Sequence, residues 1–436
     1  MFMKRNATVA LLAVALLAVL MPSCTNNYFN EERYEDLVKS TFPVSDIDSL
    51  HDWNLLKTVN AVFDLSASPA GKYVVDLYDG NPSDSSTKKL ATGVVSGYGS
   101  FKFNLGKDDD RTRLYAVAYD GENCVLNGFS PFTGSTLFVQ SEPSAGFSRP
   151  DAIVAKDVEY TYCFEETFPE GGDFDFNDVV MGVTISKIPK AGSLGGHVVE
   201  LTIRLRAVGG FRPLAASLRI ADVTPEMLAP TFSMPRKGWD FFVYADYFID
   251  DPKGEIRKCK NGDARIDLFN DAHYALNGGK LDKSGTQVPR YYINTQLEME
   301  EPEWESADVK TSTYRIEFLD EEAFNEFNFT DIDLFLISSY NASFYEIHTP
   351  PYFGLRAVKD YPTNIYYIPW ALVVPELIQY PLEGIPMGKF SSDLNYYEGA
   401  YQQTQYSFGA WARNRNNVAA WGWYHYPNDK SVYPLN

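Results

Sequence analysis

The sequence has few cysteines, few histidines and no recognisable catalytic motif. Its 436 residues include four cysteines and five histidines. Beyond the first 24 residues only Cys124, Cys163 and Cys259 remain, and they show no Cys-x-x-Cys or Cys/His spacing. Three cysteines cannot all pair with one another, and a zinc site of the usual spacing is excluded. The absence of a phosphate-binding glycine loop and of a local serine-hydrolase motif sets nucleotide and serine-hydrolase chemistry aside.

Positive charge is also scarce. Lysine and arginine together number 38 against 58 aspartates and glutamates, which gives a formal net charge of −20 at pH 7. Such an acidic surface is repelled by phosphate backbones and by anionic lipid headgroups, so we expect no nucleic-acid partner. Long apolar runs are missing after residue 24, so no transmembrane helix is predicted there.

The N-terminus has the pattern of an export signal. Lys4 and Arg5 precede an apolar segment, residues 9–21, that is short for a bilayer span. The sequence Leu-Met-Pro-Ser-Cys, which ends at Cys24, resembles a lipobox. We therefore predict cleavage before Cys24 and lipidation of its sulfur. The alternative is an ordinary signal peptide that ends near a cysteine.

The predicted location follows from the lipid. A lipidated Cys24 anchors the chain to the outer membrane of a cell envelope, which is its predicted membrane partner. Glu31 and Glu32 follow closely, and acidic residues behind the lipidated cysteine predict exposure at the cell surface.

The remaining chain reads as all-β. Aromatic residues make up 15% of the sequence, including 29 Tyr and 29 Phe, and several segments alternate apolar and polar residues with a period of two. We predict two β-sandwich domains, of jelly-roll or immunoglobulin-like type, with long loops and few short helices. The predicted units are a signal peptide (1–23), a tether and docking segment (24–57), a small sandwich (58–150), and a larger domain (151–436) with a loop-rich insertion near 245–310.

An acidic stretch at residues 165–178 dominates the larger domain. It reads Glu-Glu-Thr-Phe-Pro-Glu-Gly-Gly-Asp-Phe-Asp-Phe-Asn-Asp and contains no Lys or Arg. In a straight strand, Asp173 and Asp175 would share a face with the apolar residues that follow Asp178. One face cannot be both an acidic row and a core face. We therefore expect the chain to bend near Asp178, with Phe174 and Phe176 pinning an acidic loop to the protein.

Crowded carboxylates suggest a cation. Calcium takes six to eight oxygen ligands from such loops. The Asp-x-Asp-x-Asn spacing matches the start of an EF-hand loop, but Asp178 stands where that loop needs Gly and Thr184 where it needs Glu. The hypothesis is a different calcium loop, whose alternative is a solvated acidic turn. Its candidate ligands are Asp173, Asp175, Asn177 and Asp178, with Glu165 and Glu166 as further candidates.

A family resemblance supports this hypothesis. Phe164-Glu165-Glu166, followed after a short spacer by Gly-Asp-Phe-Asp-Phe-Asn-Asp-Val-Val at residues 172–180, resembles the signature of the LruC-domain family. The resemblance implies an envelope lipoprotein whose shared domain has no assigned biochemical function, and it raises the expectation of calcium. Glu166 departs from the family pattern, which has Asp there. The similarity continues in islands, including Glu346-Ile347-His348, over about two thirds of the chain after the signal peptide.

Glu346 and His348 are candidate accessory residues. They fall on one side of an extended chain, so they either assist the acidic loop or lock the end of a strand by a carboxylate–imidazole hydrogen bond. The sequence does not decide between three functions. The leading one is a non-catalytic binding or interaction module with a glycan or protein partner; the alternatives are a glycan hydrolase with paired carboxylates and a subunit of a fimbria-like assembly.

Overall fold

The computed structural model describes residues 47–436 apart from several internal gaps. The gaps are 70, 122, 142–145, 151, 169–171, 190–196, 230–255, 260, 270, 278–291, 298–303, 341–342, 351, 353–367, 392–394, 398–399, 403–405 and 436. The predicted signal peptide, Cys24 and the acidic pair Glu31–Glu32 all lie outside the described residues.

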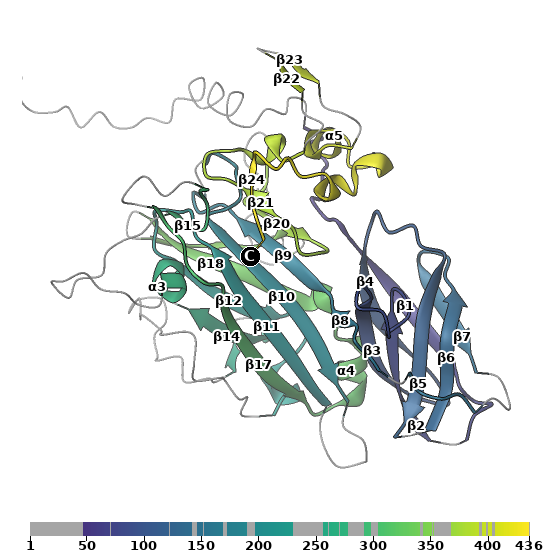
Figure 1. The fold of residues 1–436 in the computed structure, drawn as a ribbon. Coiled ribbons are helices and arrows are strands. Elements are labelled where there is room, and N and C mark those ends of the chain that lie inside the picture. Colours follow the sequence, from purple (N-terminus) through teal and green to yellow (C-terminus); the bar gives the residue numbers. More distant parts are fainter. Residues whose placement is uncertain are drawn as a thin grey trace, which may run out of the picture.

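The first part of the described chain is a small β-sandwich (Figure 1). One of its sheets has the strand order β4-β1-β7 and the other has the order β6-β5-β2-β3-β8. The strands are β1 (Leu56–Asp64), β2 (Lys72–Tyr78), β3 (Lys88–Ser96), β4 (Tyr98–Gly106), β5 (Arg113–Asp120), β6 (Asn123–Pro131), β7 (Thr136–Gln140) and β8 (Lys156–Asp157). The core between the sheets includes Phe63 and Phe101, whose rings stack 5.2 Å apart.

The second part is a larger sandwich of two five-stranded sheets. Their strand orders are β17-β11-β10-β9-β20 and β13-β14-β12-β18-β19. The first sheet contains β9 (Glu159–Phe164), β10 (Val179–Ile188), β11 (His197–Ala207), β17 (Lys310–Phe318) and β20 (Ala371–Val374). The second contains β12 (Leu214–Ile220), β13 (Arg257–Lys258), β14 (Ala264–Phe269), β18 (Ile332–Tyr340) and β19 (Ser343–Ile347).

The remaining elements are short. The strand pairs are β15 (Tyr292–Ile293) with β16 (Trp304–Glu305), β21 (Tyr380–Pro381) with β24 (Val432–Tyr433), and β22 (Asn395–Tyr397) with β23 (Ala400–Gln402). The α-helices in the described part of the chain are α3 (Ala272–Asn277), α4 (Glu321–Glu326) and α5 (Phe408–Arg413). The 3-10 turns are η1 (Pro225–Met227), η2 (Phe329–Asp331), η4 (Met387–Lys389), η5 (Val418–Ala420) and η6 (Trp423–His425). The protein is therefore all-β, as the sequence predicts.

Strand alternation in the sequence matches the burial in the sheets. In β11, Leu201, Ile203 and Leu205 are buried, whereas Thr202 and Arg204 between them are half-buried. This is the period-two pattern of a strand with one face in a core. The core between the two large sheets is built from such inward residues.

Two segments differ from the predicted boundaries. Strand β14 lies inside the region predicted as a loop-rich insertion near 245–310, yet it pairs with β12 within the second sheet. Its inward residues Ala264, Ile266 and Leu268 are buried, so this part of the predicted loop-rich insertion is a core strand. Strand β8 lies beyond residue 150 but joins the sheet of the small sandwich, where it pairs with the start of β3.

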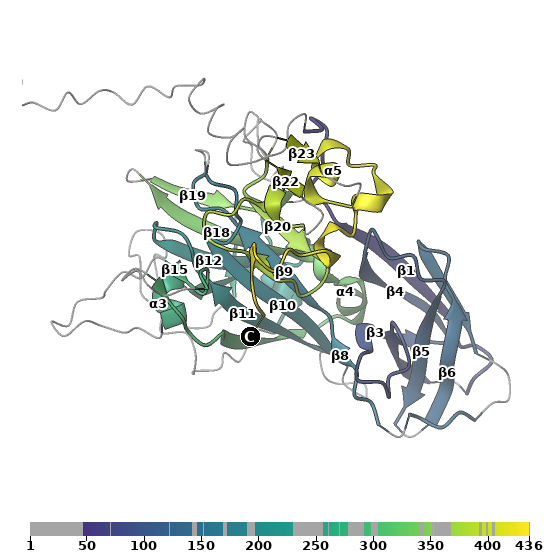
Figure 2. The same cartoon turned by 45° about the horizontal axis from the view of Figure 1, so that its top comes forward.

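The described C-terminal segments, from β21 (Tyr380–Pro381) to β24 (Val432–Tyr433), lie over one end of strands β9, β10 and β20 (Figures 1 and 2). We call these segments the cap. The cap has its own apolar core, which includes Trp411 and Trp423. Trp53, in the segment before β1, joins the same core and packs against Trp411 with ring centroids 5.3 Å apart. The part of the predicted docking segment that the structure describes is therefore packed against the cap.

Candidate functional site: an acidic loop under the C-terminal cap

The acidic loop connects two neighbouring strands. Phe164 at the end of β9 pairs with Val179 at the start of β10, so residues 165–178 must reverse the chain at one end of the sheet. Phe174 and Phe176 adopt positive φ angles of 58° and 57°, which bulky residues rarely do. Both rings are fully buried in the cap core. The bend that the sequence predicts before Val179 is thus confirmed, with the two phenylalanines as its anchors.

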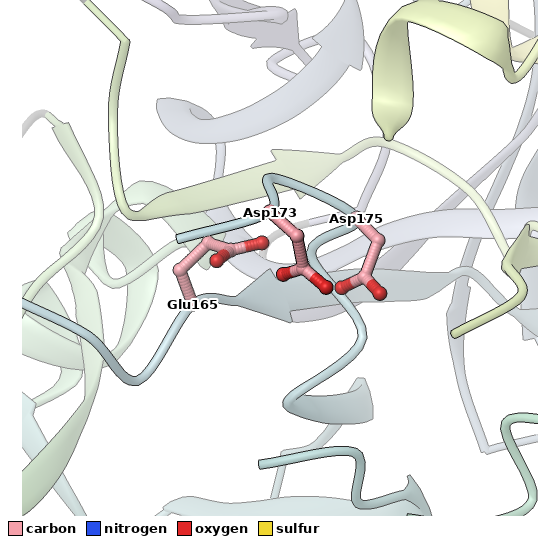
Figure 3. Close-up of side chains that lie close together, drawn as sticks. All are labelled: Glu165, Asp173 and Asp175. Carbon is pink, nitrogen blue, oxygen red and sulfur yellow. The ribbon is translucent and has the colours of Figure 1, made fainter. Parts of the chain in front are cut away.

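The loop gathers its carboxylates in one place. Oxygen atoms of Glu165, Asp173 and Asp175 all lie within 4.8 Å of one another. Figure 3 shows Glu165, at the end of β9, and the two loop aspartates with their carboxylates turned toward one another. Glu165, Asp175 and Asn177 have no exposed surface, whereas Asp173 is half-buried, so the cluster is largely shielded from solvent.

Backbone N–H groups satisfy part of this oxygen set. Phe176 donates to Oε1 of Glu165 at 2.7 Å, and Glu166 donates to Oδ2 of Asp178 at 2.6 Å. Asp175 accepts from Asn177 at 3.2 Å and from Gly384 at 2.8 Å. A carboxylate offers about four acceptor sites, so most of the acceptor capacity remains.

Glu166 faces a different element. Its two carboxylate oxygens accept backbone hydrogen bonds from Phe211 at 2.9 Å and Arg212 at 2.6 Å, in the loop between β11 and β12. The guanidinium of Arg212 donates to the Glu166 carbonyl at 3.0 Å. Both carboxylate oxygens of Glu166, like those of Asp175, therefore already accept a backbone hydrogen bond. Glu166 differs in having the Arg212 guanidinium beside it, which partly offsets its charge.

Several buried oxygens near the loop have no partner at all. They are Oε2 of Glu165, Oγ1 of Thr167, Oδ1 of Asn177 and Oε2 of Glu383. An unpaired buried acceptor costs about 1–3 kcal/mol, and native proteins rarely keep several in one place. A cation that binds among them would satisfy these oxygens together.

Two glycines, Gly172 and Gly209, allow the unpaired oxygens to approach the backbone closely. A Cβ atom on Gly172 would lie 2.2 Å from Oε2 of Glu165 and 2.8 Å from Oγ1 of Thr167. A Cβ on Gly209 would lie 2.2 Å from Oδ1 of Asn177 and 2.7 Å from Oε2 of Glu383. The unpaired oxygens thus crowd against backbone that carries no side chain, and any larger residue would displace them.

Burial makes the negative charges costly. Burial, and then the neighbouring carboxylates, hold the pKa values of Glu165, Asp175 and Asp178 well above their ordinary range. Burial also raises the pKa of Asp173 and that of Glu166, although backbone donors from Arg212 and Phe211 oppose the shift at Glu166. The site favours protonation or a counter-ion over bare carboxylates.

Glu383 is a site residue that the sequence analysis did not identify. Burial, followed by repulsion from Asp178, raises the pKa of its carboxyl to about 9. It lies just after β21, far along the chain from the loop. A single glutamate in a turn gives no ligand signal by itself, so only the packing of the cap reveals it.

The candidate accessory residues lie on the other sheet of the larger sandwich. His348 follows β19 and accepts or donates through Nδ1 to Asp333 at 2.9 Å and through Nε2 to Glu346 at 3.1 Å. Burial opposes the charged form, but the carboxylates of Asp333 and Glu346 raise the pKa of His348 overall. Asp333 also pairs with Arg219 of β12 at 3.0 Å. This arrangement ties β12, β18 and β19 together.

The C-terminal aromatic residues are mostly part of the core. Trp411, Trp423 and Tyr424 are between 0% and 4% exposed, whereas Tyr426 is 44% exposed. Buried rings offer no face to a glycan, so the first three residues stabilise the cap instead.

The three described cysteines are free thiols. Cys124 and Cys163 are buried and Cys259 is half-buried. Burial raises the pKa of the Cys163 thiol to about 12, which keeps it protonated and unreactive. Among the described residues, no helix is long and apolar enough to span a bilayer.

Comparisons with known proteins leave the family open. No family model matches the chain, and no curated protein matches its sequence. One similar solved structure is described as a "putative lipoprotein" from Bacteroides ovatus, with 13% identity, a TM-score of 0.46, and coverage of 83% of this chain and 99% of that one. Another is the full-length major pilin SpaD from Corynebacterium diphtheriae, with 8% identity, a TM-score of 0.17, and coverage of 67% and 63%. Similarity at this level carries no conclusion about function, and the resemblance to LruC domains stays a prediction.

Proposed function

We propose that the chain is a lipid-anchored cell-envelope protein that acts as a non-catalytic binding module, and that a calcium ion holds its acidic loop in place. The anchor rests on the lipobox that ends at Cys24. The ion rests on one observation above all: the carboxylates of Glu165, Asp173 and Asp175 converge, while buried oxygens beside them lack partners.

The chemistry of the donor set favours calcium. All donors are carboxylate, amide, hydroxyl or carbonyl oxygens, which are the ligands of a hard cation. Calcium accepts six to eight such oxygens at 2.3–2.6 Å in irregular geometry. Magnesium demands near-octahedral geometry and retains water, which suits a buried and irregular loop less well.

A structural role follows from where the loop lies. The loop carries Phe174 and Phe176 into the cap core, so an ion that cancels its charge repulsion also fixes the cap on the sandwich. A hydrolase would instead hold two carboxylates on either side of an open cleft. Glu165 and Glu166 are 0% and 4% exposed, which favours the structural role.

Calcium dependence of stability tests the proposal. Elemental analysis of the full-length protein in detergent should find bound calcium. Because the ion binds the folded chain only, calcium at 100 times its dissociation constant adds about 2.7 kcal/mol to the free energy of unfolding. We expect a melting temperature about 3–5 °C higher in calcium than in chelator.

A pair of variants separates a bound ion from a general salt effect. Asp175→Asn should abolish most of the calcium-induced rise in melting temperature. Asp110→Asn removes an exposed carboxylate of the small sandwich and should leave the rise unchanged. Equal melting in calcium and chelator, with no calcium in the purified protein, would refute the proposal.

A further inference from the structure

Glu383 reaches the acidic loop from the C-terminal cap. The β21–β24 pair places the turn 381–384 beside the loop, and two hydrogen bonds join the turn to the loop directly. The amide of Asn177 donates to the Pro381 carbonyl at 3.1 Å, and Gly384 donates to Asp175 at 2.8 Å. The Glu383 backbone donates to the Thr295 carbonyl at 3.0 Å, and Met387 donates to the Phe174 carbonyl at 2.8 Å. These contacts therefore fix the position of the turn that carries Glu383.

Two unpaired oxygens from different parts of the chain meet at Gly209. Oδ1 of Asn177 comes from the acidic loop and Oε2 of Glu383 comes from the cap, and both are buried without a partner. Both lie within 2.7 Å of the point where a Cβ on Gly209 would stand. Two acceptors cannot hydrogen-bond to each other when one is a carboxylate and the other an amide oxygen. The Thr295 hydroxyl lies close to Glu383, and a bound cation is one partner that both oxygens can share.

We infer that the ion of the acidic loop is also bound by Glu383 and Asn177, so that it clamps the C-terminal cap to the larger sandwich. This inference rests on the proposed calcium site and adds a ligand, Glu383, that comes from the cap itself. The cap is then a calcium-dependent element, docked when the ion is present and loosened when it is removed.

Electrostatics explains why the ion should strengthen the contact between the turn 381–384 and the acidic loop. Without the ion, nothing bound at the site offsets the negative potential that Asp178, Asp173 and Glu166 exert on Glu383, so the turn 381–384 loses an attractive contact with the loop. With the ion, the same carboxylates are drawn toward one centre. Ion removal should therefore loosen the turn and the following η4 (Met387–Lys389) before the sandwich itself unfolds.

Calcium titration of Glu383→Gln tests the ligand role. The substitution keeps the shape of the side chain and removes its charge. We expect the full-length protein in detergent to bind calcium at least about tenfold more weakly, since ligand charge sets the affinity of such sites. Its melting temperature in chelator should be close to that of the wild type, because the substitution keeps the size and polarity of the side chain. The matched control is Asp429→Asn, which removes an exposed carboxylate from the same tail and should bind calcium like the wild type.

Limited proteolysis tests the clamp itself. Trypsin should cleave the wild-type protein after Lys389 faster in chelator than in calcium, and calcium should protect Glu383→Gln much less. A second variant, Gly209→Ala, inserts a methyl group against both unpaired oxygens and should weaken calcium binding as well. Its control is Gly128→Ala, where an added Cβ meets nothing within 4 Å.

The outcomes distinguish this inference from the proposed function. If the wild type binds no calcium, both are wrong. If the wild type binds calcium and Glu383→Gln binds it equally tightly, the loop site stands and the clamp is overturned. Wild-type cleavage after Lys389 at the same rate in calcium and chelator would also overturn the clamp.

Discussion

At the scale of single residues, the acidic loop depends on two strained phenylalanines. Left-handed backbone at a bulky residue costs about 1–3 kcal/mol, and Phe174 and Phe176 both adopt it. Full burial of each ring stabilises the folded state by about 1.5–3 kcal/mol. In addition, the backbone N–H of Phe176 donates to the Glu165 carboxylate. Apolar packing thus offsets the strain that turns the acidic side chains toward one another.

Phe176→Ala should therefore lower the free energy of unfolding by about 3–5 kcal/mol, the usual cost of removing a buried phenylalanine ring. Phe138 is 53% exposed, so Phe138→Ala is the matched control and should change stability by less than about 0.5 kcal/mol. Chemical denaturation in saturating calcium measures both. Similar losses for the two variants would show that Phe176 is not an anchor.

At the scale of elements, a helix of the larger sandwich completes the edge of a strand in the small one. The side-chain amide of Asn325 in α4 accepts from the Val94 N–H and donates to the Val94 carbonyl, both at 2.8 Å. Asn325 thereby takes the place of a peptide group in a neighbouring strand, on an edge of β3 that would otherwise attract other chains.

Asn325→Ala should leave both backbone groups of Val94 without these partners and cost about 1–3 kcal/mol. Glu322→Ala changes an exposed residue of the same helix and should be nearly neutral. Thermal unfolding compares the two variants, and hydrogen exchange at the Val94 amide should accelerate only in Asn325→Ala. Unchanged exchange would contradict this account of the β3 edge.

At the scale of the whole molecule, His425 links the cap to the small sandwich. Its Nε2 lies 2.8 Å from Asp108 of the β4–β5 loop, and its Nδ1 lies 2.9 Å from Glu376. Hydrogen bonds that the ring nitrogens of His425 donate to the carboxylates of Asp108 and Glu376 raise the pKa of His425 to about 10. The residue borders a polar groove of about 1140 Å³ between the two sandwiches, so solvent protons reach it.

The pH dependence of this link has a definite sign. The folded pKa of His425 is above the ordinary value of 6.5, so its charge contributes stability fully below pH 6.5 and loses that contribution as pH rises to about 10. His425→Gln cannot carry the charge. The wild type should therefore melt above His425→Gln at pH 6, and the difference should shrink steadily toward pH 10. A difference that stays constant over this range would rule out the charged link.

The sequence predicts those structural features that depend only on residues close together in the chain. Strand alternation follows from the period of side chains in a sheet, so the all-β class and strands such as β11 and β17 are visible in the residues themselves. The bend before Val179 is visible for the same reason, because a straight strand would place acidic and apolar side chains on the same face there. The sequence does not indicate strand β14, because six residues among turn residues give too short a pattern of alternation.

Contacts between residues far apart in the chain are visible only in the tertiary structure. Glu383 joins the acidic loop, and Trp53 joins the cap, only because packing brings separate parts of the chain together. The sequence by itself determined an acidic, aromatic-rich β protein with a crowded row of oxygens, because composition and alternation are local. Only the fold decided that those oxygens are buried, mutually close and shared with the C-terminal cap, because burial and convergence are properties of packing.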